Sequence, residues 1–184
     1  MCTHFPNPYS NNPFMSDAVS YPRNRFKDEY YPRSNKDEPL FVKENGEPKY
    51  AQDREGNEFY PTFDGEDVVL KTSKGFRYTK DASKTEKYPE DSYGNQKPFF
   101  DENCHVVYAK RKDGTEIYPK DNNLIEQKYD RYAKNAYGNI VYPLDAKGQP
   151  QYERDPTTHS EVYAFHPTTG NLVIGKNRDG DQVY

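Results

Sequence analysis

The sequence predicts an all-β protein built from tandem strand-turn repeats of about ten residues. Tyr recurs mostly every ten residues, sometimes nine or eleven, from Tyr31 to Tyr184. Residues flanking each turn alternate in character, as half-buried strands do. Most units also carry Asp or Asn followed by Gly between their two flanks, which is a hairpin-turn signal. The stretch YAKNAYGNIVYPLDAKGQPQY, residues 132–152, shows two copies.

Each unit reads as two short strands joined by a three-residue loop, a type I turn followed by a residue in the left-handed conformation. Asp suits the start of such a turn because its side chain accepts bonds from backbone amides. Gly suits the left-handed position because it has no Cβ. The residues predicted to build these turns are Asp53, Gly56, Asp91, Gly94, Gly114, Gly138, Asp145 and Gly148.

This turn also predicts the pairing. Lys110 should lie opposite Glu116, a favourable cross-strand pair. Ala109 should lie opposite Ile117, with Ala51 opposite Phe59 and Ala133 opposite Val141 in other units. Each Tyr then faces the next Tyr, so one face carries a tyrosine ladder and the other a stripe of small and branched residues.

Tyr-Ala alternates with Tyr-Pro at 50 and 60, 108 and 118, and 132 and 142. Because proline cannot donate to a strand ladder, pairing should weaken at every second junction. This predicts hairpin units of about twenty residues, forming an elongated antiparallel meander or a β-hairpin solenoid. A closed barrel is the competing arrangement.

Residues 1–27 lack the repeat and contain Pro6, Pro8, Pro13 and Pro22 with aromatic residues between them. Proline blocks both helix and central strand, so this segment is expected to be an extended N-terminal arm, either frayed or docking its aromatic residues on a partner or neighbouring subunit. Residues 28–184 then form the tyrosine-rich repeat domain.

Composition narrows the class of protein. Hydrophobic residues make up 32% and charged residues 30% of the chain, a composition that is compatible with a disordered protein. The 18 Tyr and 10 Phe argue against disorder, because disordered segments are poor in aromatic residues. The net charge of −4 argues against a general nucleic-acid binder. No signal-peptide pattern or membrane-spanning run is present, so we expect no membrane insertion and a location inside a cell or an assembled particle.

No catalytic constellation stands out. The four His residues are isolated, and Cys104-His105 are strand neighbours whose side chains should point to opposite faces. Cys2 and Cys104 are far apart in sequence and imply no disulfide framework. The acidic turns 53–57 and 177–181 lack the ligand spacing of a calcium loop, so turn chemistry explains them. The sequence therefore predicts no enzyme, no cofactor and no metal.

The tyrosine ladder is the one feature with binding potential, since exposed aromatic rings stack on sugars or on protein aromatic residues. The competing interpretation is that the rings simply cover one another and the lysine stems between them. The candidate binding face consists of Tyr50, Tyr60, Tyr108, Tyr118, Tyr132 and Tyr142.

The repeats over residues 31–184 resemble tandem tyrosine-rich β-hairpin repeats of the YD (RHS) type and the choline- or glucan-binding repeats of cell-surface proteins. The chain departs from both patterns, because it has no Trp and carries a Tyr-Asp pair at the repeat position only at Tyr129-Asp130. The resemblance implies extended scaffolds and binding surfaces.

We therefore expect a non-enzymatic structural or assembly protein with protein partners or self-association, such as a virion, surface or filament component. The alternative is a glycan- or peptide-binding module that uses the tyrosine ladder.

Overall fold

The computed structural model describes residues 18, 20–152, 157, 164–165 and 172–173, and every regular element among them is a short β-strand. The described part of the chain accordingly contains no helix that is long and apolar enough to cross a membrane. The protein is all-β, and its strands pair as antiparallel hairpins, as predicted.

Nine two-stranded sheets are present in the described residues, each joining strands that follow one another in the chain. The first five pairs are β1 (Val42–Glu44) with β2 (Glu47–Lys49), β3 (Ala51–Gln52) with β4 (Glu58–Phe59), β5 (Thr62–Phe63) with β6 (Glu66–Asp67), β7 (Leu70–Thr72) with β8 (Gly75–Arg77), and β9 (Thr79–Lys80) with β10 (Glu86–Lys87). The other four are β11 (Phe99–Phe100) with β12 (Val106–Val107), β13 (Ala109–Lys110) with β14 (Glu116–Ile117), β15 (Ala133–Lys134) with β16 (Ile140–Val141), and β17 (Ala164–Phe165) with β18 (Leu172–Val173).

Five further hairpins among the described residues are closed by a single bridge instead of a ladder. All five begin just after a Tyr-Pro dipeptide, and proline can supply no amide to a ladder. The bridges are Arg23 with Glu29, Arg33 with Pro39, Glu90 with Gln96, Lys120 with Glu126, and Leu144 with Pro150.

The predicted register is confirmed. Lys110 pairs with Glu116 and Ala109 with Ile117. Ala51 pairs with Phe59, and Ala133 with Val141. The twenty-residue unit is wrong, however, because each ten-residue repeat closes its own two-stranded sheet and no strand of one sheet pairs with a strand of the next. Proline therefore distinguishes one type of ten-residue hairpin and does not mark the boundary of a twenty-residue hairpin.

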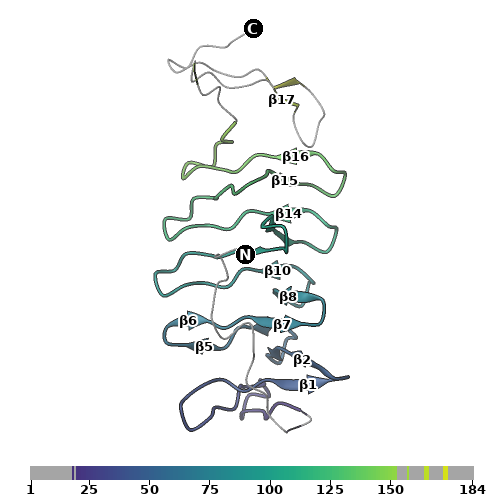
Figure 1. Ribbon diagram of the computed structural model, residues 1–184, viewed down its shortest axis with the longest axis vertical. Coiled ribbons are helices and arrows are strands. Elements are labelled where there is room, and N and C mark those ends of the chain that lie inside the picture. Colours follow the sequence, from purple (N-terminus) through teal and green to yellow (C-terminus); the bar gives the residue numbers. More distant parts are fainter. Residues whose placement is uncertain (1–17, 19, 153–156, 158–163, 166–171, 174–184) are drawn as a thin grey trace.

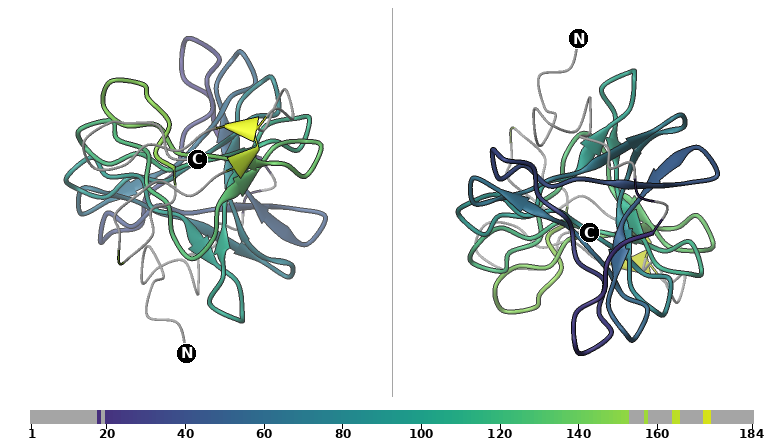
Figure 2. Two further views of the ribbon diagram at one scale, coloured as in Figure 1. Left: turned by 90° about the horizontal axis from the view of Figure 1, so that it is seen from above. Right: turned by 90° about the horizontal axis from the view of Figure 1, so that it is seen from below.

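The hairpins are stacked along the long axis of the molecule (Figure 1) and point outward in several directions when viewed along that axis (Figure 2). Hairpins three places apart in the chain lie side by side, since β2 contacts β7, β4 contacts β9, and β10 contacts β13. Backbone bonds follow the same offset. Asp67 N–H donates to Glu90 O over 3.0 Å, and Gln96 N–H donates to Lys120 O over 2.9 Å.

The stack begins earlier than the sequence indicated. Tyr21 is 4% exposed, and residues 22–30 form a hairpin in which Tyr30 N–H donates to Pro22 O over 3.1 Å. Glu29 N–H then bonds Gln52 O of a later hairpin over 2.9 Å. The boundary placed after residue 27 thus falls inside the first hairpin, because Pro22 takes part through its carbonyl and needs no N–H. The remainder of the arm, residues 1–17, lies outside the described residues.

The core runs inside the stack and is built mainly of tyrosine, phenylalanine and small residues. Two clusters of buried side chains, one centred on Tyr50 and one on Tyr108, together extend from Tyr21 to Ala133. Neighbouring rings meet edge to face, with centroids 5.1–5.3 Å apart in the pairs Tyr78–Tyr88, Tyr50–Tyr60 and Tyr108–Tyr118. This geometry suits the quadrupoles of aromatic rings.

Candidate functional site

The candidate binding face is not an exposed face. Tyr50, Tyr108 and Tyr118 are at most 2% exposed, while Tyr60, Tyr132 and Tyr142 are half-buried. The rings meet as the ladder predicted, but they meet in the interior, where the hairpins converge. The reason is that the side chains of four of them extend inward to contact a later hairpin, namely Tyr50, Tyr60, Tyr108 and Tyr118.

Each buried hydroxyl joins the two sides of one later hairpin. Tyr31 donates its hydroxyl to Phe59 O over 2.6 Å and accepts from Ala51 N–H over 2.9 Å. Ala51 and Phe59 are the innermost cross-strand pair of their hairpin. We call this arrangement a tyrosine bridge. One side chain thereby satisfies one buried backbone donor and one partly buried backbone acceptor.

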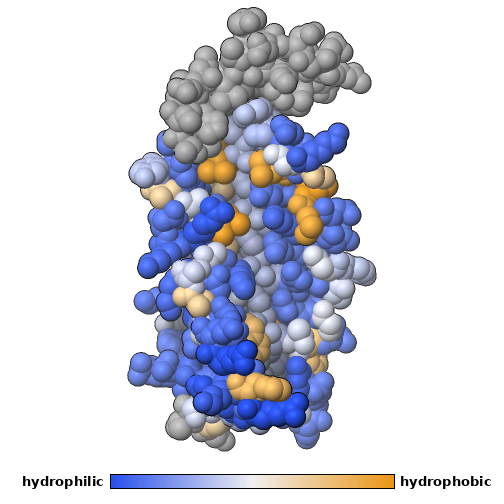
Figure 3. All heavy atoms as spheres, turned by 180° about the vertical axis from the view of Figure 1, so that it is seen from behind, coloured by the Kyte–Doolittle hydropathy of each residue, from blue (hydrophilic) through white to orange (hydrophobic). Residues whose placement is uncertain are grey.

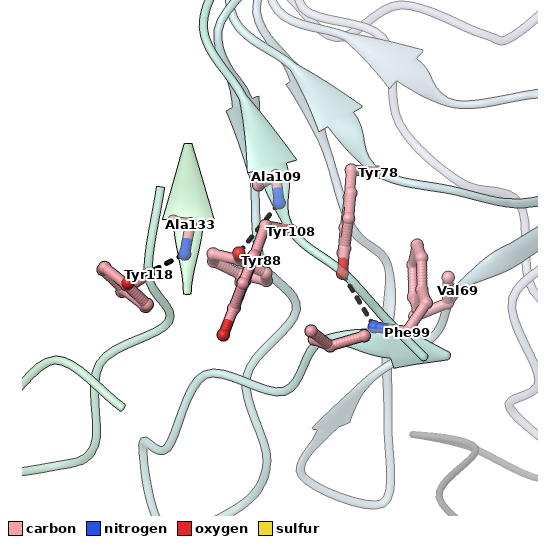
Figure 4. Close-up of a cluster of buried hydrophobic side chains, with 9 residues drawn as sticks. Val69, Tyr78, Tyr88, Phe99, Tyr108, Ala109, Tyr118 and Ala133 are labelled. Carbon is pink, nitrogen blue, oxygen red and sulfur yellow. Dashed lines mark hydrogen bonds between the residues drawn. The ribbon is translucent and has the colours of Figure 1, made fainter. Parts of the chain in front are cut away.

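Tyrosine bridges recur with a constant offset. The Tyr that precedes one hairpin reaches the innermost pair of the hairpin two places further on, and Figure 4 shows three such contacts. The bridges with their two partners are Tyr21 to Val42 and Lys49, Tyr31 to Ala51 and Phe59, Tyr50 to Leu70 and Arg77, Tyr60 to Thr79 and Lys87, Tyr78 to Phe99 and Val107, Tyr88 to Ala109 and Ile117, Tyr108 to Tyr129 and Arg131, and Tyr118 to Ala133 and Val141.

The hairpins that begin with proline explain where the tyrosines are missing. A proline has no N–H for a hydroxyl to accept. For these hairpins, the residue at the tyrosine position two hairpins earlier is not tyrosine. It is Phe41 for the hairpin that begins with Pro61, Val69 for Pro89, Pro98 for Pro119 and Lys128 for Pro143. In each of these hairpins the opposite residue donates its N–H to the proline carbonyl, as Val68 does to Pro61 over 2.8 Å. Tyrosine and proline are therefore placed in complementary positions.

Residues 128–131 occupy the place of a hairpin that has lost its outer part. Tyr108 accepts from Tyr129 N–H over 3.1 Å and donates to Arg131 O over 2.6 Å, as other bridges do with an innermost pair. Asp130 Oδ1 accepts from Val106 N–H over 2.8 Å, which ties this short segment to the hairpin three places back. The offset of the bridges is preserved beyond it, where Tyr118 reaches Ala133.

Burial keeps the bridging hydroxyls protonated. Desolvation raises the pKa of Tyr108 to about 12 and raises the pKa of Tyr50 and Tyr78 well above the ordinary value. A tyrosinate could not donate to a carbonyl, so a raised pKa maintains each bridge over the whole range of neutral and moderately alkaline pH. These phenols are structural donors, and none has the lowered pKa of an activated nucleophile.

Acidic side chains connect hairpins three places apart. Glu58 accepts from Lys80 N–H over 2.8 Å, and Glu86 accepts from Lys110 N–H over 2.9 Å. Glu116 accepts from Lys134 N–H over 3.0 Å and also pairs with Arg131, whose Nη1 lies 2.7 Å from Glu116 Oε1. The sequence had suggested only that Glu116 pairs with Lys110 across one hairpin. Its second role was missed because the offset of three hairpins has no local signal.

Asp67 is the acid of this kind whose pKa is raised. Its Oδ2 accepts from Glu90 N–H over 2.8 Å. Burial raises the pKa of Asp67 to about 6, and the hydrogen bond from Glu90 only partly offsets that effect. The negative charge of Glu90 adds to the increase.

The turn residues serve their own loops. Asp53 Oδ1 accepts from Glu55 N–H over 2.8 Å and from Asn57 N–H over 2.9 Å, and Gly56 adopts a φ of 87°. Asp91 and Asp145 bind their loops in the same way, and Gly94, Gly114, Gly138 and Gly148 all have positive φ. Residues 177–181 lie outside the described residues. Among the residues that are described, no cluster of three or more His, Cys, Asp or Glu is arranged to hold a metal.

The Cys104-His105 pair has two separate partners. His105 Nδ1 lies 3.0 Å from Asp130 Oδ2 at the surface. Cys104 is disulfide-bonded, although the cysteine spacing had implied no disulfide framework. Spacing along the chain could not show it, because the partner of Cys104 is brought close only by folding. The chain has one other cysteine, Cys2, which lies outside the described residues.

Several surface grooves lie between hairpins in the described part of the chain. The first, about 650 Å³, is charged and lined by Glu29, Glu44, Glu47, Lys49, Glu58 and Arg77. The second, about 580 Å³, lies between the β7–β8 and β11–β12 hairpins and has an aromatic floor of Phe76, Phe99 and Phe100. We call this second one the aromatic groove. Sequence reasoning missed both, since each joins residues from repeats that are not consecutive.

No protein-family model and no curated protein matches this sequence.

Proposed function

We propose that the chain is a non-enzymatic structural protein whose hairpins form a β-hairpin solenoid with three hairpins per turn. The constant offsets support this: acids and backbone groups join hairpins three places apart, and tyrosine bridges join hairpins two places apart. In a helical stack with three hairpins per turn, the first offset is one full turn and the second is two thirds of a turn.

The tyrosine bridge is the observation that carries the proposal. It replaces the usual aliphatic core by hydrogen-bonded rings, so that each hairpin is held by earlier parts of the chain and in turn holds later ones. Such an interior gives a straight, rigid support and leaves the outer ends of the hairpins free to vary. The face seen in Figure 3 is mostly hydrophilic, with separate apolar spots, which fits a scaffold that displays loops on its sides.

We further propose that the scaffold assembles with a protein partner or with further copies, in a virion, surface layer or filament, and that the N-terminal arm provides a contact. The described hairpins do not favour the alternative of glycan binding on the tyrosine ladder, because Tyr50, Tyr108 and Tyr118 are buried. Their hydroxyls are also already engaged by backbone groups.

Electron microscopy and light scattering of the full chain test this proposal. The matched variant lacks residues 1–17 and keeps Tyr21, so the first hairpin stays in place. A rod in both proteins, with self-association or partner capture only in the full chain, would support the proposal. A compact particle without a long axis would contradict the solenoid, and equal association of both proteins would contradict the role of the arm.

A further inference from the structure

The aromatic groove lies where two hairpins three places apart meet through aromatic rings and not through an acid. Glu58, Glu86 and Glu116 hold equivalent positions on the second strands of their hairpins, each bonding the backbone of the hairpin three places on. On β8 this position, opposite Lys71, is taken by Phe76, which has no acceptor. An aromatic contact takes the place of the acid, with the Phe76 and Phe99 ring centroids 5.3 Å apart.

The groove therefore presents apolar surface to solvent. Phe99 forms a buried floor, Phe76 and Phe100 are half-buried, and Val107 is 38% exposed. Lysines and acids stand at its edges, namely Lys71, Lys74, Asp101 and Glu102. A partly exposed row of aromatic rings within a charged border suits a segment that is apolar and carries little charge.

The disulfide identifies such a segment. Cys104 follows the groove-lining residues Asp101, Glu102 and Asn103 in the same turn. Cys2 is the only other cysteine of the chain, so it is the only residue with which Cys104 can form a disulfide within one chain. Residues 3–17, THFPNPYSNNPFMSD, contain three aromatic residues, three prolines and one acid. Proline-rich segments with aromatic residues dock in aromatic grooves with little loss of chain entropy.

The length of the arm allows this path. Residue 2 and residue 18 are separated by sixteen residues, which reach at most about 55 Å when extended. The hairpin at residues 23–29 and the β11–β12 hairpin are eight places apart in the chain, which is about 2.7 turns of the proposed stack. At two strands per turn and about 4.8 Å per strand, this is a rise of about 26 Å. Phe5 follows Cys2 by three residues, which is about 10 Å of extended chain.

We propose that the aromatic groove is the docking site of the N-terminal arm of the same chain, with Phe5 placed against Phe76 and Phe100 and the disulfide of Cys104 holding the arm there. The docking rests on the proposed stack for the reach of the arm, and it does not require the proposed assembly with a partner. Where the arm also contacts a partner, it leaves the groove first.

Limited digestion of the oxidised full chain with chymotrypsin tests the proposal, because the arm offers cleavage sites at Phe5, Tyr9 and Phe14. Phe100→Ser removes part of the groove, and Leu124→Ser is the matched control, since Leu124 is 74% exposed on another hairpin. Circular dichroism establishes that both variants fold, and non-reducing mass spectrometry establishes that both keep the disulfide. We expect cleavage of the arm to be at least about tenfold faster in Phe100→Ser than in the wild type and the control.

Equal rates in all three oxidised proteins would overturn the proposal, since the disulfide would then tether an arm that does not dock. A disulfide-linked dimer on a non-reducing gel, with protection that increases with protein concentration, would also overturn it in favour of docking on a second copy. Protection that persists in Cys104→Ser at low protein concentration, and is lost when Phe100→Ser is added, would support the groove contact apart from the covalent bond.

Discussion

Replacing Tyr50 with Phe removes one hydroxyl and leaves a buried backbone donor and a partly buried backbone acceptor without that partner. The hydroxyl donates to Arg77 O over 2.7 Å and accepts from Leu70 N–H over 2.8 Å. Tyr50 is 1% and Leu70 is 0% exposed, so water does not replace the lost group. The ring itself keeps its edge-to-face contacts with Phe41 and Tyr60.

The expected loss of stability follows from those two groups. A buried donor or acceptor that loses its partner costs about 1–3 kcal/mol. The carbonyl of Arg77 can use a second lone pair and the backbone can relax slightly, which places the total near the lower part of the summed range. We therefore expect Tyr50→Phe to lower the free energy of unfolding by about 3 kcal/mol.

Urea denaturation measures the total, and amide hydrogen exchange at Leu70 measures the bridge itself. The exchange of Leu70 N–H should accelerate strongly in the variant, while the amides of distant hairpins change little. Tyr137→Phe is the matched control, because Tyr137 is 89% exposed, and it should change stability by less than about 0.5 kcal/mol. A loss in Tyr50→Phe no larger than in the control, together with unchanged exchange at Leu70, would refute the bridge as a stabilising contact.

Three further perturbations test other contacts. Asp67→Asn should stabilise the fold at pH 7–8 by about 1–2 kcal/mol, allowing for solvent screening, and by little below pH 4. The reason is that the raised pKa of Asp67 makes the stability of the wild type fall as pH rises from about 4 through about 6. A difference in stability between the two proteins, measured by urea denaturation, that is the same at all pH values would contradict this. Phe41→Tyr alone should not increase stability, because Pro61 has no N–H. In the Pro61→Ala background the same change should be more favourable to stability by about 1–2 kcal/mol. Strict additivity in this double-mutant cycle would show that the tyrosine and proline positions are unrelated. Gly56→Ala should cost about 1 kcal/mol in thermal or urea unfolding, since Gly56 has a φ of 87° with no atom near its Cβ position, and a neutral result would mean that the turn relaxes.

The local half of the fold could be predicted from the sequence. The register of Ala109 with Ile117 depends only on a turn of known length and on alternation within ten residues, and the structure confirms it. The twenty-residue unit failed because proline was taken as a boundary between hairpins. Its actual position is inside each hairpin, where Pro61 accepts from Val68 N–H.

The long-range half could not be predicted in the same way. A tyrosine every ten residues is compatible with an exposed ladder or with buried bridges, and only the offset to a later hairpin distinguishes them. A usable signal was nevertheless present in the sequence. Phe41, Val69, Pro98 and Lys128 replace tyrosine at the positions whose partner begins with proline. The aromatic groove and the bond of Cys104 had no comparable signal.

The shortened segment at residues 128–131 has a consequence for how this chain can change in length. The outer part of a hairpin is absent there, yet Tyr129 and Arg131 still supply the two backbone groups that Tyr108 requires. Lengthening or shortening the outer loops therefore leaves the order of partners intact. Removal of one complete repeat, by contrast, would place the hydroxyls of upstream tyrosines opposite prolines, which have no N–H. It would also place upstream residues that are not tyrosine opposite backbone amides that need an acceptor. Insertions in homologues or designed variants should accordingly accumulate at the loop tips, while the number of inner pairs changes only together with the tyrosine and proline order.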